Sequence, residues 1–313
     1  MSTFPTATPD EPLPSVRQVS GDIRVISARR SVLGRAAEVW RYRELLGGLI
    51  RKELKVRYKD SALGFAWSLL NPALNLVVYF FVFRIVARNN VPRFAIFLLS
   101  GLLVWNLFSA AVSGGTSSIV ANSSIIKKVA FPREILPLAA AGAALVHFFL
   151  QTLVLLAALA VFQHAPSPQY LLLVIPTLAV LVLLGSGIGI LLGAINVHLR
   201  DTQHLLELVL MAWFWLTPIV YPLALPLVAL DRNGLTWLYL LNPLTPIVVT
   251  FQRAIYNNLA PVGVDGTVVQ VLPAESVGWY ITHVGIVGAI AVVIFYIALV
   301  VFGRLEGNFA EEL

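Results

Sequence analysis

The stretch from Arg51 to Arg84 decides the fold of this chain, and it reads RKELKVRYKDSALGFAWSLLNPALNLVVYFFVFR. Its basic first part, residues 51–60, runs directly into an apolar segment that starts near Phe65. Clustered positive charges stay in water and favour the anionic cytoplasmic leaflet, whereas the apolar segment enters lipid. The stretch therefore predicts an integral membrane protein whose residues before the first span lie in the cytosol.

The composition of the whole chain also indicates a membrane protein. Its 313 residues are 58% hydrophobic and only 12% charged, with a mean hydropathy of +0.83. A soluble globular protein carries about 25% charged residues, so lipid must solvate much of this chain. The net charge of +6 follows from the positive-inside rule, and no nucleic-acid partner is needed to explain it. The absence of cysteine excludes disulfides, thiolate catalysis and cysteine-ligated metals.

Apolar runs and basic residues together predict the topology. A spanning helix needs about 20 apolar residues, and six runs approach or exceed that length: Phe65–Val86, Phe94–Ser113, Pro137–Phe162, Leu171–Val197, Leu205–Tyr221 and Thr282–Phe302. With the N-terminus inside, 17 of the 22 Lys and Arg residues fall on the cytosolic side. We therefore expect an all-α integral membrane protein with six transmembrane helices, residues 61–303, and both termini in the cytosol.

Two segments precede the first span. Residues 1–30 are predicted to form a disordered cytoplasmic tail, because they are polar and rich in proline. No apolar region follows them, so a cleaved signal peptide is not expected. Residues 31–60 are predicted to form an amphipathic helix along the inner membrane surface. Its apolar face consists of Val39, Tyr42, Leu46, Leu49 and Ile50. This helix is either a lipid-facing anchor or a docking element for a cytosolic partner. At the other end of the chain, residues 304–313 form a short cytoplasmic tail.

The region between the fifth and sixth spans, Pro222 to Ile281, is too long for a turn, and residues 222–258 within it are the predicted re-entrant segment. It holds two apolar runs, Trp237–Leu241 and Thr245–Ile255, each too short to span a bilayer. Non-helical backbone at membrane depth survives only where protein or a wet cavity surrounds it. We predict re-entrant helices that dip into the outer leaflet; a small external cap is the alternative.

Motifs of soluble catalysis are missing. The chain has no GxxxxGK[ST] phosphate loop, no HExxH and no cluster of metal ligands, so no cofactor or metal site is predicted. Two ionisable residues fall within the spans. His147 shares a helix face with Gln151, and a polar contact between helices is the favoured interpretation. Glu207 lies near the inner end of the fifth span, where it is predicted either to reach the cytosol with its carboxylate or to form a gating or charge pair with Arg200.

Aromatic residues crowd the first and fifth spans. Four of them, Tyr79, Phe80, Phe81 and Phe83, occupy the outer half of span one, and Trp213, Phe214 and Trp215 follow one another in span five. An interfacial aromatic belt explains most of them. The span-one residues point in all directions, however, so some must face protein or a pore. Aromatic faces stack on the C–H surfaces of sugar rings, and a polymer can slide past such a surface.

Four segments in this order resemble a known family. They are the basic helix, RYKDSALGFAWSLLNPAL from residue 57, KKVAFPREILP from Lys127 to Pro137, and RDTQHLLELVLMAWFWLTPIVYP from Arg200 to Pro222. Together they are similar to the permeases of ABC exporters that move O-antigen, capsular polysaccharide or teichoic acid. The resemblance covers residues 38–303. It implies a homodimer with two copies of a cytosolic ATPase subunit, which would bind the ATP and Mg²⁺. It also implies a polyprenyl-pyrophosphate-linked polysaccharide as cargo and the bacterial cytoplasmic membrane as location.

The resemblance also assigns roles to residues. Docking of the ATPase subunit is expected at the basic helix and at the loop between spans two and three: Arg51, Lys52, Lys55, Arg57, Lys59, Lys127, Lys128, Pro132 and Arg133. The channel of this family is lined mainly by spans one and five. We therefore expect Tyr79, Phe80, Phe83, Trp213 and Trp215 to contribute to a channel between two copies of the chain.

Two other functions remain open from the sequence. One is an ABC permease for small lipophilic compounds or drugs. The other is a membrane-embedded glycosyl transferase, for which the acidic residues near Asp201 and Glu207 are the candidate chemistry. The chain has 17 Arg and 5 Lys, a composition that resembles proteins of bacteria with GC-rich genomes. A cell-wall galactan therefore stays open as cargo beside O-antigen and teichoic acid.

Overall fold

The computed structural model describes residues 32–58, 61, 64–86, 91–129, 131–226, 239, 241–257, 259 and 271–312. Within these ranges every regular element is a helix. The predicted tail 1–30, Lys59 and most of the predicted apolar run 237–241 lie outside the described residues.

Five helices in the described part of the chain are long and apolar enough to cross a membrane. They are α3 (Trp67–Phe80) with a π-helical continuation to Val86, α4 (Phe94–Ala121), α6 (Ile135–Val161), α7 (Pro168–His198) and α12 (Val277–Leu305). The predicted fifth span, Leu205–Tyr221, overlaps α8 (Thr202–Leu216), which begins three residues earlier and has only 15 residues. The all-helical membrane fold is confirmed, and the count of six spans is not.

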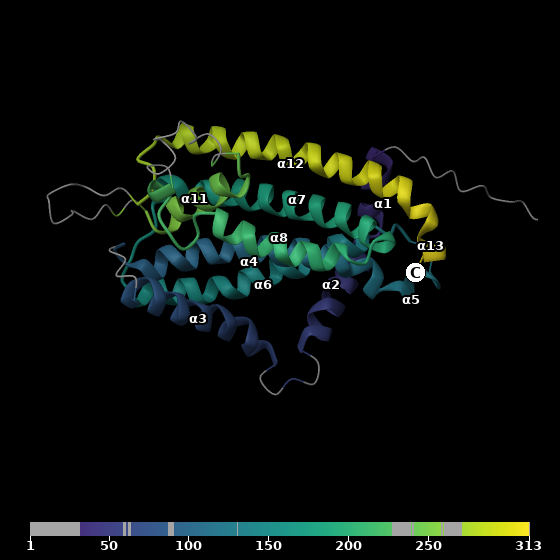
Figure 1. The fold of residues 1–313 in the computed structure, drawn as a ribbon, viewed down its shortest axis with the longest axis horizontal. Helices are drawn as coiled ribbons and strands as arrows, with labels where there is room; N and C mark the ends of the chain where they lie inside the picture. The colour runs from purple at the N-terminus through teal and green to yellow at the C-terminus, as the bar shows by residue number, and fades with distance from the viewer. Residues whose placement is uncertain are drawn as a thin grey trace, which may run out of the picture.

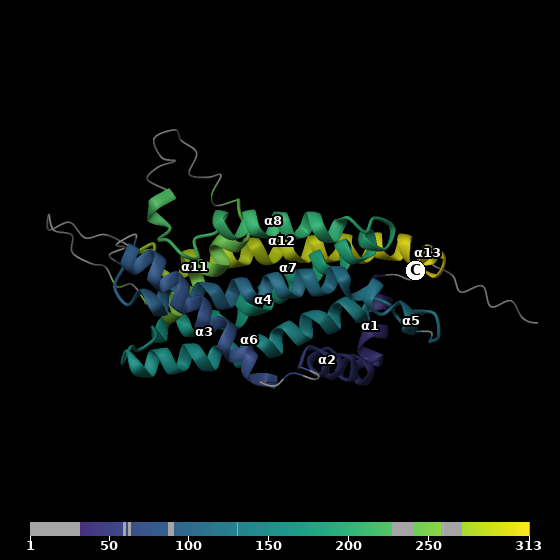
Figure 2. The ribbon, with the colours of Figure 1, turned by 60° about the horizontal axis from the view of Figure 1, so that its bottom comes forward.

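Short helices gather at the two ends of the bundle. One end, called the α5 end below, holds α1 (Val32–Arg41), α2 (Arg43–Tyr58), α5 (Ser123–Ile126) and α13 (Phe309–Glu312). The opposite end holds α11 (Leu244–Ile255) beside the first turns of α4 and α12 (Figure 1). Figure 2 shows α8 and α12 on one side of the bundle, with α3, α6 and α2 on the other.

Helix α4 forms the centre of the bundle. In its most apolar 18-residue window 83% of the residues are buried, against 28–33% for α6, α7 and α12. Glycines bring α4 and α7 into backbone contact: a Cβ added at Gly115 would lie 2.8 Å from the Cα atom of Gly189. Small residues allow such close approach between membrane helices. Glycine packing therefore fixes the position of α4 against α7, and other helices pack against α4.

Helices α3 and α8 flank α4 and leave apolar side chains uncovered. Only 6% of the apolar window of α3 is buried. On α8 the exposed residues include Leu205, Leu208, Met211 and Leu216. Exposed apolar faces of this extent need lipid or another protein surface against them.

The predicted amphipathic helix is divided into α1 and α2 at Tyr42. Leu49 is buried, and Val39, Tyr42, Leu46 and Ile50 pack against the hydrophobic cluster at the α5 end of the bundle. Ile50 fits over Gly142 of α6, where an added Cβ would lie 2.5 Å from its Cδ1 atom. Much of the apolar face thus packs on protein, where the sequence predicted contact with the membrane surface.

Residues 217–223, which follow α8, have no helical structure but are almost all buried. Ile219 and Val220 are fully buried, and the Gln252 side chain of α11 donates to the carbonyl of Pro218 at 3.2 Å. α11 itself covers nearly the same residues as the second predicted apolar run and is buried along almost its whole length. Irregular backbone enclosed by protein in this way is compatible with membrane depth. The re-entrant placement of α11 stays a prediction.

Candidate functional site

A groove runs between α3 and α8, with α4 as its floor. It has a volume of about 340 Å³ and is lined by Asn75 and Tyr79 of α3, four residues of α4 that include Trp105 and Asn106, and Leu210, Met211, Phe214 and Trp215 of α8. The groove therefore lies between the two helices whose apolar faces are most exposed. Apolar and aromatic walls with a few polar side chains are typical of ligand-binding grooves.

Aromatic rings connect the two walls of the groove to its floor. The Tyr79 ring stacks on Phe214 at a centroid distance of 5.9 Å, and Phe214 meets Trp105 edge to face at 5.4 Å. Trp215 packs against Phe214 at 5.3 Å and keeps half of its surface exposed. Offset and edge-on pairs of this kind stabilise one another beyond their buried area. The result is a pre-formed aromatic surface that remains open on one side.

The five predicted channel residues divide into two groups. Tyr79 and Trp215 line the groove. Phe83 packs between Tyr79 and Phe94, and Phe80 is partly buried against the main core. Trp213 turns into the bundle, where its indole N–H donates to the Asn242 Oδ1 atom at 2.9 Å and its ring meets Phe108.

Two aromatic residues of the groove were not singled out for the channel from the sequence. Trp105 lies in the middle of α4, and Phe214 lies between the two tryptophans of α8. The helical period offered a signal for Phe214, because it is four residues from Leu210 and shares its helix face. Nothing in the local sequence of Trp105 indicates that α8 packs over it.

The basic residues predicted to dock a partner also divide into two groups. Exposed side chains belong to Arg51, Lys55 and Arg57 of α2 and to Lys127 and Lys128 just after α5. Lys52 instead donates to the Asn122 Oδ1 atom at 2.5 Å and thereby ties α2 to the end of α4. Pro132 is partly buried.

Arg133 is held within the chain. One of its Nη atoms donates to the Glu306 carbonyl at 2.5 Å, and the guanidinium lies 5.7 Å from the centre of the Phe309 ring. Phe309 is fully buried and also packs against Phe302 and His198. The segment after α12 therefore connects the loop that carries Lys127 and Lys128 to the end of α7.

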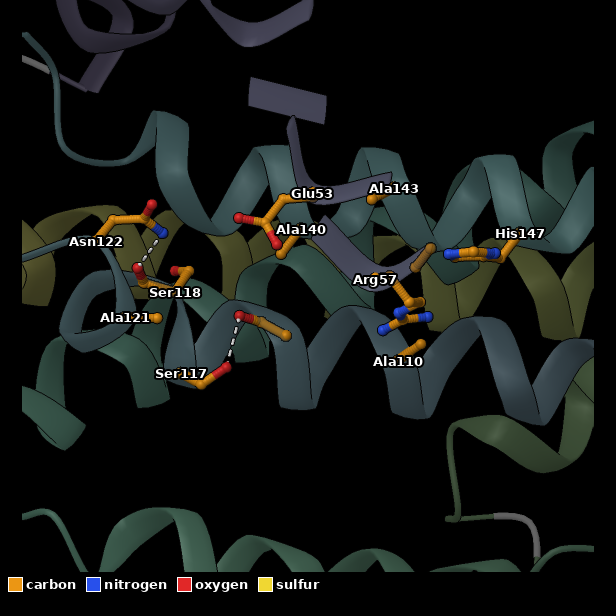
Figure 3. Close-up of a pocket in the computed structure, with 12 residues that line it drawn as sticks. Glu53, Arg57, Ala110, Ser117, Ser118, Ala121, Asn122, Ala140, Ala143 and His147 are labelled. Carbon is orange, nitrogen blue, oxygen red and sulfur yellow. Dashed lines mark hydrogen bonds between the residues drawn. The ribbon is translucent and has the colours of Figure 1, made fainter. Parts of the chain in front are cut away.

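A second cavity lies between α2, α4 and α6, towards the α5 end (Figure 3). Its volume is about 150 Å³. Small residues of α4 and α6 form most of the wall, and Glu53 and Arg57 of α2 close it. His147, predicted to make a polar contact between helices, lines the same cavity, and its Nδ1 atom is 3.3 Å from the Ser68 hydroxyl. Gln151, on the same face, accepts from the Asn106 amide at 3.2 Å.

The predicted pair of Arg200 and Glu207 is not formed in the structure. Both side chains are exposed, and no ion pair joins them within the part of the chain that the structure describes. The same described residues contain no group of three His, Asp or Glu side chains placed to hold a metal ion.

At the α11 end, a buried histidine ties three segments together. An Arg93 Nη atom donates to the His164 Nδ1 atom at 2.5 Å, so the Nε2–H group of His164 is left to donate to the Tyr256 carbonyl at 3.0 Å. The Tyr256 hydroxyl donates in turn to the Pro92 carbonyl at 2.8 Å. Burial, and then the Arg93 charge, lowers the pKa of His164, although the carbonyls of Tyr256 and Ile255 act in the opposite direction. His164 is therefore held neutral outside the spanning helices.

Comparison with known proteins identifies the family. Residues 44–256, about two thirds of the chain, match the family model described as ABC-2 type transporter. The chain belongs to the ABC-2 type transporter family. The match begins in α2 and ends just after α11. It therefore includes both walls of the groove, the small cavity, and the segment after α5 that carries Lys127 and Lys128, called the α5 loop below.

Named relatives are permeases of polysaccharide export. The chain is 35% identical over 242 residues to the O-antigen export system permease protein RfbA of Myxococcus xanthus, covering 77% of this chain and 90% of the relative. It is 32% identical over 273 residues to the protein of the same name from Klebsiella pneumoniae, covering 86% and 95%. The polysialic acid transport protein KpsM of Escherichia coli is 24% identical over 221 residues, covering 69% and 83%.

These relatives and the apolar helices agree on the broad assignment. The chain is a multi-pass protein of the bacterial inner membrane and a permease of the ABC transporter class. The names of these relatives all describe transport proteins.

Proposed function

We propose that this chain is the transmembrane subunit of an ATP-driven exporter that moves a polyprenyl-linked polysaccharide from the cytosol to the periplasmic side. The observation that carries the proposal is the aromatic groove between α3 and α8, with Tyr79 and Trp215 on its walls. Ring faces contact sugar rings without fixed hydrogen bonds, so they hold a polymer and still let it slide. The cargo class named for the relatives supports the same assignment.

The channel is proposed to form between two copies of the chain. The groove is open on one side, and its two walls carry the exposed apolar faces of α3 and α8. A second copy placed against these faces would cover them and would close two grooves into one passage. Symmetric dimers are the commonest way in which one surface patch covers itself.

ATP hydrolysis is proposed to occur in a separate cytosolic subunit that docks at the α5 end. Lys127 and Lys128 are exposed beside α5, and Arg51 and Lys55 are exposed on α2. Exposed basic side chains steer a partner of opposite charge and set its orientation. With this end in the cytosol, α11 lies towards the periplasm.

The experiment is an export assay in cells in which this chain is the sole permease, with polymer measured at the surface and inside the cell. The double variant Tyr79→Ala/Trp215→Ala is expected to lower surface polymer by tenfold or more. Truncation of an important interface aromatic costs over about 1 kcal/mol of binding free energy, and two such residues are removed here. The matched control is Tyr296→Ala, an exposed aromatic of α12 that lies outside the groove.

Two outcomes would contradict the proposal. One is wild-type export by the double variant at equal membrane abundance. The other is normal surface polymer after depletion of the chain together with lost efflux of a lipophilic dye, which would favour the alternative permease for small compounds. Cell-wall galactan, teichoic acid and O-antigen would be told apart by the composition of the polymer that accumulates inside depleted cells.

A further inference from the structure

The small cavity between α2, α4 and α6 contains two opposite charges that do not neutralise one another. Glu53 and Arg57 are four residues apart on α2 and therefore share one face of that helix. Both line the cavity, and Figure 3 shows their side chains reaching into the space between α4 and α6. No ion pair joins the two within the described residues.

Neighbouring polar groups leave these two charges available. The basic residue next to Glu53, Lys52, is bonded to Asn122. The Ser117 and Ser118 hydroxyls, which also line the cavity, donate to carbonyls of their own helix at Ser113, Gly114 and Gly115. Their oxygen lone pairs remain as acceptors. The cavity thus offers a cation at one end, and an anion with hydroxyl acceptors at the other.

The size of the cavity restricts its occupant. A volume of about 150 Å³ is that of a cavity that holds one benzene-sized molecule. It accommodates a headgroup and excludes a sugar polymer. Glu53 is half-buried, and Arg57, although its side chain is exposed, lines the same cavity. A ligand that carries both signs would form charge-assisted hydrogen bonds with both residues at once.

From these observations we propose that the cavity binds the headgroup of a zwitterionic phospholipid of the phosphoethanolamine type. The phosphate oxygens accept from Arg57, and the ammonium donates to Glu53 and the serine hydroxyls. The inference rests on the proposed function for one point, the placement of α2 at the level of the inner-leaflet headgroups. The lipid would then lie between α2 and the bundle and would stabilise α2 in its position.

An anionic phosphate without an amine is the competing ligand, and the phosphate group of a polyprenyl carrier is of this kind. Arg57 would attract it, but Glu53 would repel it from the same cavity. The two ligands therefore predict opposite effects of removing the carboxylate, which makes Glu53 the decisive residue.

The test is native mass spectrometry of the delipidated full-length chain, titrated separately with phosphatidylethanolamine and phosphatidylglycerol. The wild-type chain is expected to bind one phosphatidylethanolamine per copy in preference to phosphatidylglycerol. Glu53→Gln should weaken phosphatidylethanolamine binding roughly tenfold and leave phosphatidylglycerol unchanged or tighter, because a charge-assisted hydrogen bond contributes on this scale. Arg57→Gln should weaken binding of both lipids.

Matched controls are Glu44→Gln and Arg51→Gln, which change exposed charges of α2 outside the cavity. They are expected to bind both lipids like the wild type. Ala143→Leu fills the cavity from α6 without changing any charge, and it should abolish the preferred site even if a charge variant folds poorly.

Equal binding of phosphatidylethanolamine by the wild type, Glu53→Gln and Ala143→Leu would overturn the proposal. Tighter phosphatidylglycerol binding at this site in the wild type, increased further by Glu53→Gln, would also overturn it in favour of an anion site. The measurement requires neither ATP nor polysaccharide. Failure of the lipid site would leave the proposed export function standing, and the converse also holds.

Discussion

The ring of Tyr79 on α3 lies against the ring of Phe214 on α8, with centroids 5.9 Å apart and planes inclined by 29°. This contact joins the two walls of the groove across α4. A passage that widens for a sugar chain must separate these walls. The contact between Tyr79 and Phe214 therefore belongs to the closed arrangement of the groove.

A cross-link between the two walls should stop export. The chain has no cysteine, so the pair Tyr79→Cys/Phe214→Cys carries its only thiols. A short thiol-reactive cross-linker is expected to block surface display of polymer, and a cleavable version should restore it on reduction. The control pair is Phe148→Cys/Phe251→Cys, which joins α6 and α11 at a centroid distance of 6.0 Å away from the groove. Undiminished export with the first pair fully cross-linked would show that these walls do not separate.

Charge reversal beside α5 should weaken the ATPase complex. Lys127→Glu/Lys128→Glu changes two exposed side chains, so the fold should be retained. Co-purification of the ATPase subunit is expected to fall, with a stronger effect at low salt, because exposed charges act within about 10 Å at 0.1 M ionic strength. Arg304→Glu, an exposed charge reversal on α12, serves as the control for reversing a charge elsewhere on the chain. Intact co-purification and intact export in the double variant would place the docking surface elsewhere.

Closing the glycine contact between α4 and α7 should destabilise the bundle. A Cβ at Gly189 would lie 3.1 Å from the Ala111 carbonyl oxygen and 3.2 Å from the Gly115 Cα atom, which are backbone atoms that cannot rotate away. Gly189→Ala is expected to cost about 1–3 kcal/mol, the usual range for overpacking, and to lower the melting temperature in detergent. Gly285→Ala on α12 has nothing within 4 Å and should be neutral or stabilising. Equal melting temperatures for both variants would contradict the packing argument.

Protonation of His164 should loosen the α11 end. Its pKa is lowered in the folded chain by burial and by Arg93, so the unfolded chain takes up the proton first. Neutral His164 contributes fully to the free energy of unfolding above the ordinary histidine pKa of about 6.5. This contribution decreases as the pH falls from there towards the lower pKa that His164 has in the folded chain. The melting temperature of the wild type should fall between about pH 7.5 and 5, and His164→Gln should lose part of that dependence. His204→Gln, at an exposed site on α8, should retain it. An identical pH profile for wild type and His164→Gln would refute the prediction.

Removal of the Phe309 ring should disconnect the α5 loop from α7. Phe309 contacts Arg133, Phe302 and His198. Truncating a phenylalanine to alanine in a packed core lowers the free energy of unfolding by about 3–5 kcal/mol, because a cavity remains. Phe309→Ala is expected to lower stability, whereas Phe309→Leu should restore most of it.

If Arg133 transmits movement from the ATPase subunit, export per ATP hydrolysed should fall in Arg133→Ala while the complex still assembles. Unchanged coupling would limit Arg133 to a structural role.

Hydropathy located the long helices well but not all their ends. The second span is predicted to end at Ser113, yet α4 continues to Ala121. The hydroxyls of Thr116, Ser117 and Ser118 donate to carbonyls of the same helix one turn earlier. A polar run can therefore remain helical where a hydropathy pattern indicates an end.

The candidate site was predictable only in part. Aromatic crowding identified α3 and α8, and Tyr79 and Trp215 do line the groove. The contribution of Trp105 depends on how α8 crosses α4, which is a matter of tertiary packing. The two opposite charges of the small cavity were also not evident from the sequence. Glu53 and Arg57 look like ordinary members of a basic helix until the packing of α2 on α4 and α6 is known.

The 15 residues of α8 have a consequence for the lipid around the groove. At a rise of about 1.5 Å per residue the helix is about 22 Å long, whereas the hydrocarbon layer of a bilayer is about 30 Å thick. If α8 forms the fifth span, as the sequence predicts, this hydrophobic mismatch would draw the two headgroup layers together beside it. The polar sugar chain would then cross its greatest dielectric barrier where that barrier is thinnest.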